Sequence, residues 1–306
     1  MQDYLREKVL HLKPTYKTNL GSAFNASIEE FILSPKFEEL KGTVDLILTS
    51  PPYPLVSPKA YGNRVGDDYK SWLSDIMTEL KLLLKPKGSL VVEIGNAWDK
   101  GQPTMSTLPI ETLIQIKNQA ELNVCQQFIW NNPNKLPGPA TWVNIKRIRV
   151  KDAFTHIWWY APSIDPRANN QKVLTPYGDG MKKLLETQNY NRGMRPSGHN
   201  IGDGFLKGNK GAIPSSVLTY ANTKEDPEYR AWCRDKGVSQ HPARMPEKLA
   251  EFFINLTTSK NSLILDPFGG SNTTGKAAEN LGRRWVSIER DPEYVLGSKG
   301  RFQKRR

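Results

Sequence analysis

Short apolar runs alternate along the chain with longer stretches in which apolar residues recur at helical spacing. Residues 44–48 and 89–94 are nearly continuous apolar runs, typical of strands that are buried on both faces. Between them, residues 67–84 carry apolar side chains at the period of a helix, which the sequence Lys-Pro-Lys-Gly at 85–88 should end. Similar patterns predict strands at 17–24, 124–130, 155–160, 263–266 and 284–289, and helices at 27–40, 108–118, 245–256 and 276–281. Strands that alternate with helices indicate an α/β fold with parallel strands at the centre of its sheet.

Residues 162–240 depart from this pattern. Regular periodicity fades, glycine and asparagine become frequent, and basic residues are scattered among aromatic ones. Eight glycines lie between Gly178 and Gly211, which favours loops shaped by turns over a packed sheet. The spread of Tyr, Trp, Phe, Leu and Val argues against full disorder. We therefore expect three parts, with boundaries at 1–161, 162–240 and 241–306.

The apolar run at 44–48 ends abruptly in Ser50-Pro51-Pro52-Tyr53. Two consecutive prolines fix the backbone and remove two hydrogen-bond donors, so the strand must stop there. The resulting rigid turn offers carbonyl oxygens, a hydroxyl and an aromatic ring, which together could hold a planar amine. A simple strand terminator is the alternative interpretation of this segment.

A second strand-turn-helix motif lies near the C-terminus. The strand at 263–266 ends in Asp266, and the turn continues as Pro267-Phe268-Gly269-Gly270-Ser271-Asn272-Thr273. Adjacent glycines let a backbone approach a ligand closely. The next strand ends in Glu289, near the spacing at which an acidic residue binds ribose hydroxyls in nucleotide-binding sheets. A phosphate-binding loop is disfavoured because Ala277, not Ser or Thr, follows Gly275-Lys276. On its own, this motif could also be a plain tight turn.

With both motifs in place, the chain resembles the β group of DNA amino-methyltransferases, and within it the PvuII-type modification methylases. In that group a Ser-Pro-Pro-Tyr catalytic motif precedes the S-adenosyl-L-methionine motif, as it does here. The resemblance extends to Trp130-Asn131-Asn132-Pro133, to residues 146–151 and to His241-Pro-Ala-Arg-Met-Pro at 241–246. It implies a Rossmann-like methyltransferase sheet with a permuted motif order, and it places the target-recognition region in the loop-rich part at 162–240.

The resemblance also implies roles for individual residues. Ser50, Pro51, Pro52 and Tyr53 would be catalytic: Ser50 and the Pro51 carbonyl would accept the amine hydrogens, and Tyr53 would stack on a flipped-out base. The expected cofactor-binding residues are His241, Asp266, Pro267, Phe268, Gly269, Gly270, Ser271, Asn272, Thr273 and Glu289. For His241, a loop histidine with only a local hydrogen bond is an equal alternative. Trp130 and Asn132 would line the pocket of the target base.

Composition supports a polyanionic partner. The 306 residues carry a formal net charge of +12, which suits double-stranded DNA. The densest basic run consists of Lys146, Arg147, Arg149 and Lys151, interpreted as phosphate contacts or, alternatively, as an ordinary solvated strand edge.

The two cysteines have no paired spacing, so neither disulfides nor a cysteine-based metal site is expected. Neither lies in the Pro-Cys turn that cytosine C5 methylation requires. The N-terminus lacks the apolar core of a signal peptide, and no run of eighteen apolar residues is present, so we expect a cytoplasmic protein of a bacterium or archaeon.

The sequence therefore predicts a site-specific, S-adenosyl-L-methionine-dependent DNA methyltransferase that acts on cytosine N4. Serine at position 50 favours cytosine, whereas adenine N6 enzymes more often carry aspartate there. The alternatives are an adenine N6 enzyme of the same fold and a DNA-binding protein without turnover. A restriction endonuclease is expected to be encoded alongside, though not as a physical partner, and no oligomeric state is indicated.

Overall fold

The computed structural model describes residues 11–53, 64–189, 193–222 and 226–303. The chain folds into two compact units. Unit 1 comprises residues 1–168 and 216–306, and unit 2 comprises residues 169–215. Unit 2 therefore lies inside the loop-rich part at 162–240 that the sequence sets apart.

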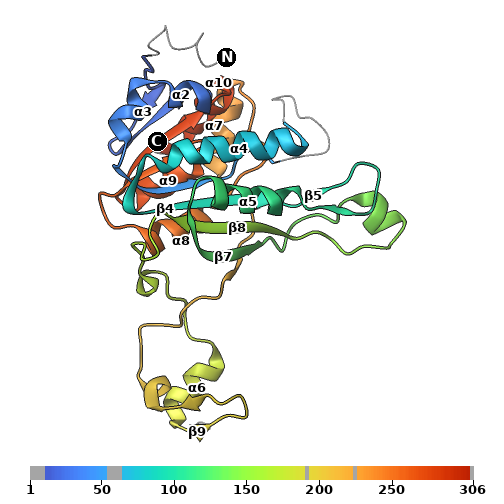
Figure 1. The fold of residues 1–306 in the computed structure, drawn as a ribbon, viewed down its shortest axis with the longest axis vertical. Helices are drawn as coiled ribbons and strands as arrows, with labels where there is room; N and C mark the ends of the chain where they lie inside the picture. The colour runs from blue at the N-terminus through green and yellow to red at the C-terminus, as the bar shows by residue number, and fades with distance from the viewer. Residues whose placement is uncertain (1–10, 54–63, 190–192, 223–225, 304–306) are drawn as a thin grey trace. The chain divides into compact units, whose positions relative to one another are not determined.

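Unit 1 is built on a nine-stranded mixed sheet (Figure 1). In spatial order its strands are β1 (Tyr16–Lys17), β2 (Gly21–Asn25), β13 (Arg284–Glu289), β12 (Leu263–Asp266), β3 (Val44–Thr49), β4 (Leu84–Gly95), β8 (Phe154–Ala161), β7 (Asn123–Asn131) and β11 (Val217–Thr219). The five strands from β2 to β4 are parallel, whereas β8 runs antiparallel to both of its neighbours. The predicted α/β fold with parallel strands at its centre is confirmed.

Helices cover both faces of this sheet. They are α2 (Ile28–Ile32), α3 (Pro35–Leu40), α4 (Gly66–Lys81), α5 (Leu108–Gln119), α7 (Pro227–Lys236), α8 (Glu247–Thr257), α9 (Thr273–Asn280) and α10 (Pro292–Ser298). Figure 1 shows α4 and α5 in front of the strands. Ile47 and Leu265 share one apolar core with residues of α4 and α5, while β3 also contacts α8. All six residues of β3 are buried, because a strand with helices on both faces has no solvent-facing side.

Two local expectations need correction. The predicted helix at 27–40 is two helices, because Pro35 lacks the amide hydrogen that a continuing helix would need and instead begins α3. The first of them starts as a capping box, with Ser27 and Glu30 bonded reciprocally. The predicted strand at 17–24 is the hairpin of β1 and β2, with the turn closed by Thr18 and Gly21.

Three smaller elements complete unit 1: the hairpin of β5 (Ala97–Trp98) and β6 (Met105–Ser106), the π-helix at Thr141–Ile145, and a 3-10 turn at Lys299–Phe302. Unit 2 contains α6 (Asp179–Thr187), the hairpin of β9 (Gly193–Met194) and β10 (Asn200–Ile201), and 3-10 turns at Asn170–Lys172 and Asp203–Leu206. A bridge between Thr175 and Ala212 closes it near its two ends. Within the part of the chain that the structure describes, no helix combines the length and apolar character needed to cross a membrane.

Candidate functional site

The two sequence motifs open onto one cavity. Strands β3 and β12 pair in parallel, with Leu46 opposite Ile264, so both motifs follow the carboxyl ends of neighbouring strands. The Thr49 hydroxyl donates a 2.9 Å hydrogen bond to Asp266 Oδ1 across this junction. The cavity beside it, of about 440 Å³, is lined by Ser50–Tyr53, Asp266–Ser271, Thr273, Glu289, His241, Trp130 and Asn132, among others. Most of the predicted site residues are thus brought together.

Asp266 lies at the buried floor of this cavity. Its Oδ1 accepts hydrogen bonds from Thr49 and from the Phe268 amide. Burial raises the pKa of this carboxyl to about 6, although hydrogen bonds from Thr274 and Thr49 partly oppose the shift. Asp266 therefore fixes the start of the glycine turn while its charge remains only weakly compensated.

The glycine turn packs closely against the protein around it. Gly270 has φ +51°, and a Cβ at this position would lie 3.1 Å from His241 Nε2. Its amide donates to Glu289 Oε2 at 2.8 Å, while Glu289 Oε1 accepts from the Asp291 amide. Burial raises the pKa of Glu289. The site thus combines the backbone of the glycine turn, the Glu289 carboxylate at the end of the next strand and the hydroxyls of Ser271 and Thr273. This set of donors and acceptors fits a nucleoside.

Asn272 has a different place from the one predicted. It does not line the cavity, and it is buried with φ +57° at the N-cap of α9. Its Oδ1 accepts from the Gly275 amide, and its Nδ2 donates to the Tyr16 hydroxyl at 2.9 Å. The side chain is therefore used to cap a helix and to tie the turn to β1, not to reach a ligand.

Glu93 is the main residue that the sequence reasoning missed. It lies near the carboxyl end of β4, is 1% exposed, and lines the cavity. The Ser50 hydroxyl donates to its Oε2 at 2.5 Å, and the Tyr53 hydroxyl lies 2.6 Å from both of its carboxylate oxygens. Burial raises the pKa of Glu93, partly opposed by these hydrogen bonds. The sequence signal that could have identified Glu93 is its charged side chain inside the otherwise apolar run at 89–94.

The Tyr53 ring lies against Gly95, where a Cβ would come within 2.6 Å of the ring. Glycine at the end of β4 therefore makes room for the tyrosine. Because the hydroxyl is bonded to Glu93, the ring is fixed at the wall of the cavity. Ser50, Tyr53 and Glu93 form one hydrogen-bonded group, in which Glu93 is fully buried.

Trp130 and Asn132 line the same cavity from strand β7 and the residues that follow it. Strand β7 is parallel to β4 because both are antiparallel to β8, so its carboxyl end reaches the same edge of the sheet. Trp130 Nε1 donates to the Tyr220 carbonyl at 2.8 Å, and the Asn132 amide donates to the Ala153 carbonyl. Both side chains are buried within the protein and border the cavity.

Lys146, Arg147, Arg149 and Lys151 are not among the lining residues, and they follow a π-helix in a loop instead of forming a strand edge. Arg149 stacks on Trp98 with its Cζ 3.7 Å from the ring centroid. Their contact with phosphates stays a prediction.

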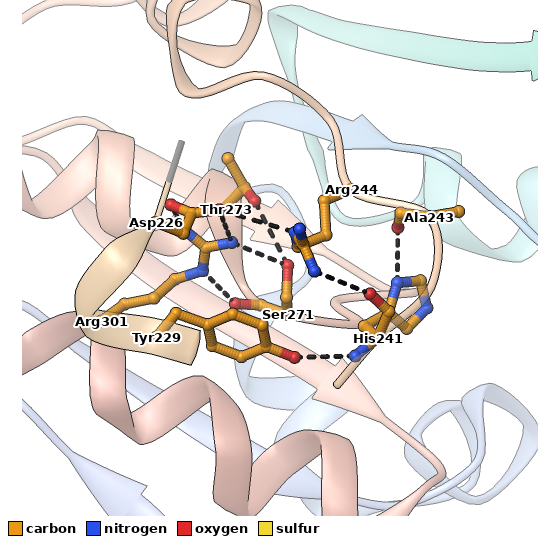
Figure 2. A network of polar contacts seen from close by, with 8 residues as sticks. All are labelled: Asp226, Tyr229, His241, Ala243, Arg244, Ser271, Thr273 and Arg301. Atoms are coloured by element: carbon orange, nitrogen blue, oxygen red, sulfur yellow. Dashed lines mark hydrogen bonds and ion pairs between the residues drawn. The ribbon is translucent and has the colours of Figure 1, made fainter. Parts of the chain in front are cut away.

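A buried arginine network braces the glycine turn (Figure 2). Arg301 donates from Nε to the Ser271 carbonyl at 2.5 Å and from Nη2 to Ser271 Oγ at 2.9 Å. The same guanidinium forms a bidentate ion pair with Asp226. Its Cζ lies 4.9 Å from the centroid of the Tyr229 ring. The Tyr229 hydroxyl accepts from the His241 amide, and Arg244 donates to the His241 carbonyl. The glycine turn and the His241 segment are therefore held by one set of contacts.

Comparison with known proteins agrees with this geometry. A model of the DNA methylase family matches residues 44–299, which is most of the chain. The chain belongs to the DNA methylase family. It is 42% identical to the type II methyltransferase M.PvuII of Proteus hauseri over 292 residues, covering 95% of this chain and 86% of that protein. The resemblance inferred from the two motifs is confirmed.

Solved structures of DNA methylases share the fold. The PvuII DNA methyltransferase, described as cytosine-N4-specific, has a TM-score of 0.77 and 34% identity, covering 96% of this chain and 90% of that one. The M1.HpyAVI–SAM complex has a TM-score of 0.58 at 20% identity and covers 93% of this chain and all of its own, which shows the fold alone. The predicted methyltransferase sheet is thus confirmed.

The raised pKa of Asp266 gives this DNA methylase a testable pH dependence. A carboxyl whose pKa rises on folding from 3.8 to about 6 opposes folding when ionised, and this penalty disappears as the pH falls through that interval. Between pH 7 and pH 4 the wild type should therefore gain up to about 3 kcal/mol in unfolding free energy relative to Asp266→Asn. Urea unfolding of both proteins over this pH range measures the difference. A difference that does not change with pH would contradict the assignment.

The network around Arg301 should support cofactor affinity as well as folding. The shorter amide side chain of Arg301→Gln cannot donate to Asp226 and Ser271 at once, so the glycine turn should lose its fixed position. We expect Arg301→Gln to weaken binding of S-adenosyl-L-methionine by about tenfold, which corresponds to about 1.4 kcal/mol. Isothermal titration calorimetry measures this affinity.

Arg283→Gln is the matched control for this prediction. Arg283 is also buried, but it bonds Thr258, Leu281 and Asn255, away from the cavity. Both variants should lower the unfolding free energy, whereas only Arg301→Gln should lower cofactor affinity. Equal losses of affinity in the two variants would refute a specific role of Arg301.

Proposed function

We propose that this DNA methylase transfers a methyl group from S-adenosyl-L-methionine to the N4 amino group of a flipped-out cytosine in double-stranded DNA. The observation that carries the proposal is the single cavity in which Ser50-Pro-Pro-Tyr53 meets the Asp266–Ser271 turn. One motif suits an exocyclic amine and the other suits a nucleoside cofactor.

The cofactor end is assigned to the Asp266 side. Glu289 would bind the ribose hydroxyls, Gly269 and Gly270 would pass close to the methionine part, and His241 would lie at its amino-acid end. Asp266, Pro267, Phe268, Ser271 and Thr273 line the same half of the cavity. When bound, S-adenosyl-L-methionine supplies an electrophilic methyl group on a sulfonium. The structure of M1.HpyAVI with SAM, which has the same fold, supports this choice of cofactor.

Ser50 acts on the amine through its place beside Glu93. The Ser50 hydroxyl hydrogen is directed to Glu93, so the oxygen lone pairs remain available to accept from the cytosine amine. The Pro51 carbonyl would accept the second hydrogen. These two acceptors favour the pyramidal nitrogen that attacks the methyl group, because the amine lone pair is otherwise conjugated with the ring.

Glu93 would receive the proton that the nitrogen releases after transfer. Its pKa is raised by burial, and it lies one hydrogen bond beyond Ser50. Tyr53 would stack on the extracted base, with its hydroxyl held by the same carboxylate. Trp130 and Asn132 would form the facing wall of the base pocket.

Cytosine N4 is favoured over adenine N6 by serine at position 50 and by the cytosine-N4 specificity named for the PvuII enzyme. Methylation of cytosine C5 would need a cysteine thiolate at the cavity, and neither Cys125 nor Cys233 is a lining residue. Burial also raises the pKa of the Cys125 thiol to about 11, which disfavours the thiolate. An adenine N6 enzyme of the same fold remains the competing assignment.

The biological setting follows from this chemistry. Residues 162–240 would read the target sequence, and Lys146, Arg147, Arg149 and Lys151 would contact phosphates. The enzyme would serve in the cytoplasm as the modification half of a restriction–modification system, with its endonuclease encoded alongside. The relation to type II methyltransferases such as M.PvuII supports this setting.

Nucleoside analysis tests the function directly. Unmodified phage DNA incubated with the protein and methyl-labelled S-adenosyl-L-methionine should yield labelled N4-methylcytosine after digestion. N6-methyladenine in its place would establish the competing assignment. Cofactor binding without any label in the DNA would favour a DNA-binding protein that has lost turnover.

The Ser50–Glu93 pair should affect turnover and not cofactor affinity. Ser50→Ala removes an acceptor, and Glu93→Gln removes the carboxylate that orients it, so each should lower kcat by about 10²-fold or more. Cofactor affinity, measured by calorimetry, should stay near the wild-type value. Ser89→Ala is the control, since Ser89 lies on the same strand but bonds Trp159 within the core. Wild-type turnover in Glu93→Gln would remove Glu93 from the mechanism.

A further inference from the structure

Residues 133–151 form a lobe between β7 and β8, the green segment that extends beyond the ends of those strands in Figure 1. Both ends of this 133–151 lobe are fixed at the cavity. Lys135 and Ala153 line the cavity, and Lys135 pairs with Asp152 at 3.2 Å. The Asn132 amide bonds the Ala153 carbonyl at 2.8 Å. The lobe therefore rises from the rim of the candidate active site.

The lobe has internal structure. Its middle is the π-helix at Thr141–Ile145, and the Ile148 amide donates to the Trp142 carbonyl at 3.0 Å. Lys146 lies over the Trp142 ring, and Arg149 stacks on Trp98 of the β5–β6 hairpin. These contacts hold Lys146 and Arg149 and shape the backbone between them.

Four large aliphatic side chains of this lobe are exposed. The exposed fractions are 82% for Leu136, 74% for Ile145, 61% for Ile148 and 88% for Val150. Single exposed aliphatic residues are ordinary, but several within one short segment at a site rim are typical of an interaction surface.

The positive charge of the lobe indicates which kind of partner it can bind. Residues 133–151 include five basic residues (Lys135, Lys146, Arg147, Arg149 and Lys151) and no acidic one. A second copy of the chain would bring like charges together, which disfavours self-association through this surface. A polyanion with apolar surface between its charges fits both features, and duplex DNA has this combination.

We propose that the exposed aliphatic side chains of the 133–151 lobe enter the duplex beside the target cytosine and fill the space it leaves, while the basic residues contact the flanking phosphates. This inference rests on the proposed function. Removing a base from the stack exposes the apolar faces of its neighbours, and inserted aliphatic side chains cover such faces in other DNA-bending proteins. Phosphate contacts alone would give these side chains no role.

The test compares a triple serine variant of the lobe with a single serine variant at an exposed isoleucine elsewhere in unit 1. The lobe variant carries Ile145→Ser, Ile148→Ser and Val150→Ser. The control is Ile114→Ser on α5, because Ile114 is 46% exposed but lies outside the lobe, outside residues 162–240 and away from the cavity lining. The probe is a synthetic duplex carrying the site that sequencing of wild-type-methylated phage DNA identifies.

The lobe variant should lose about tenfold or more in kcat/KM for this duplex, a change that reflects the cost of unstacking. Cofactor affinity should not change, and Ile114→Ser should behave as the wild type. When the target cytosine is placed opposite a mismatched base, flipping becomes less costly and most of the loss should disappear. Lys146→Gln with Arg147→Gln should instead reduce the salt dependence of DNA affinity by about 0.9 per lost phosphate contact.

Two results would overturn the inference: full activity of the lobe variant on the matched duplex, or an equal loss on matched and mismatched duplexes. Failure of the proposed function is separate, because it would appear as absence of N4-methylcytosine with the wild-type protein.

Discussion

The parallel pairing of β3 with β12 is the contact on which the candidate site depends. It joins two strands that are far apart in the sequence, and the Thr49–Asp266 hydrogen bond closes the junction at the point where both strands end. Because each strand is buried on both faces by helices, neither can slide or rotate without exposing apolar surface. The Ser50–Tyr53 turn and the glycine turn consequently meet at a fixed separation.

The carboxyl groups of Glu93, Asp266 and Glu289 line the cavity at this junction, although the chain is strongly basic overall. Glu93 is held mainly by hydroxyls, Asp266 by hydroxyls and an amide, and Glu289 by two amides. In each case burial raises the pKa. Neutral donors orient a carboxylate without cancelling its charge, so these groups keep the capacity to accept protons or hydrogen bonds from ligands.

The glycine turn is held from three directions by segments that no local pattern connects. Glu289 of β13 bonds Gly270, Tyr16 of β1 bonds Asn272, and Arg301 of the last turn bonds Ser271. Arg301 in turn reaches Asp226, which begins α7 after the chain has returned from unit 2. Through the Tyr220 carbonyl, the same returning segment also holds Trp130, which lines the cavity. The returning segment thus supports residues from both ends of the sheet edge.

The α/β class, most element positions and the two motifs could be predicted from the sequence, because buried strands, helical periods and proline or glycine turns are local patterns. The DNA methylase family was also indicated, since Ser50-Pro-Pro-Tyr53 and Asp266–Gly270 are contiguous motifs. Which side chains meet across strands could be seen only in the folded chain. Glu93 gave no local signal beyond a carboxylate in an apolar run, and its role became visible only beside Ser50 and Tyr53. Asn272 stood within a ligand-binding motif, yet its helix cap and its contact with Tyr16 turn it away from the cavity. Periodicity records which face of an element is buried, but not which neighbour covers it, because that depends on contacts between residues distant in the sequence.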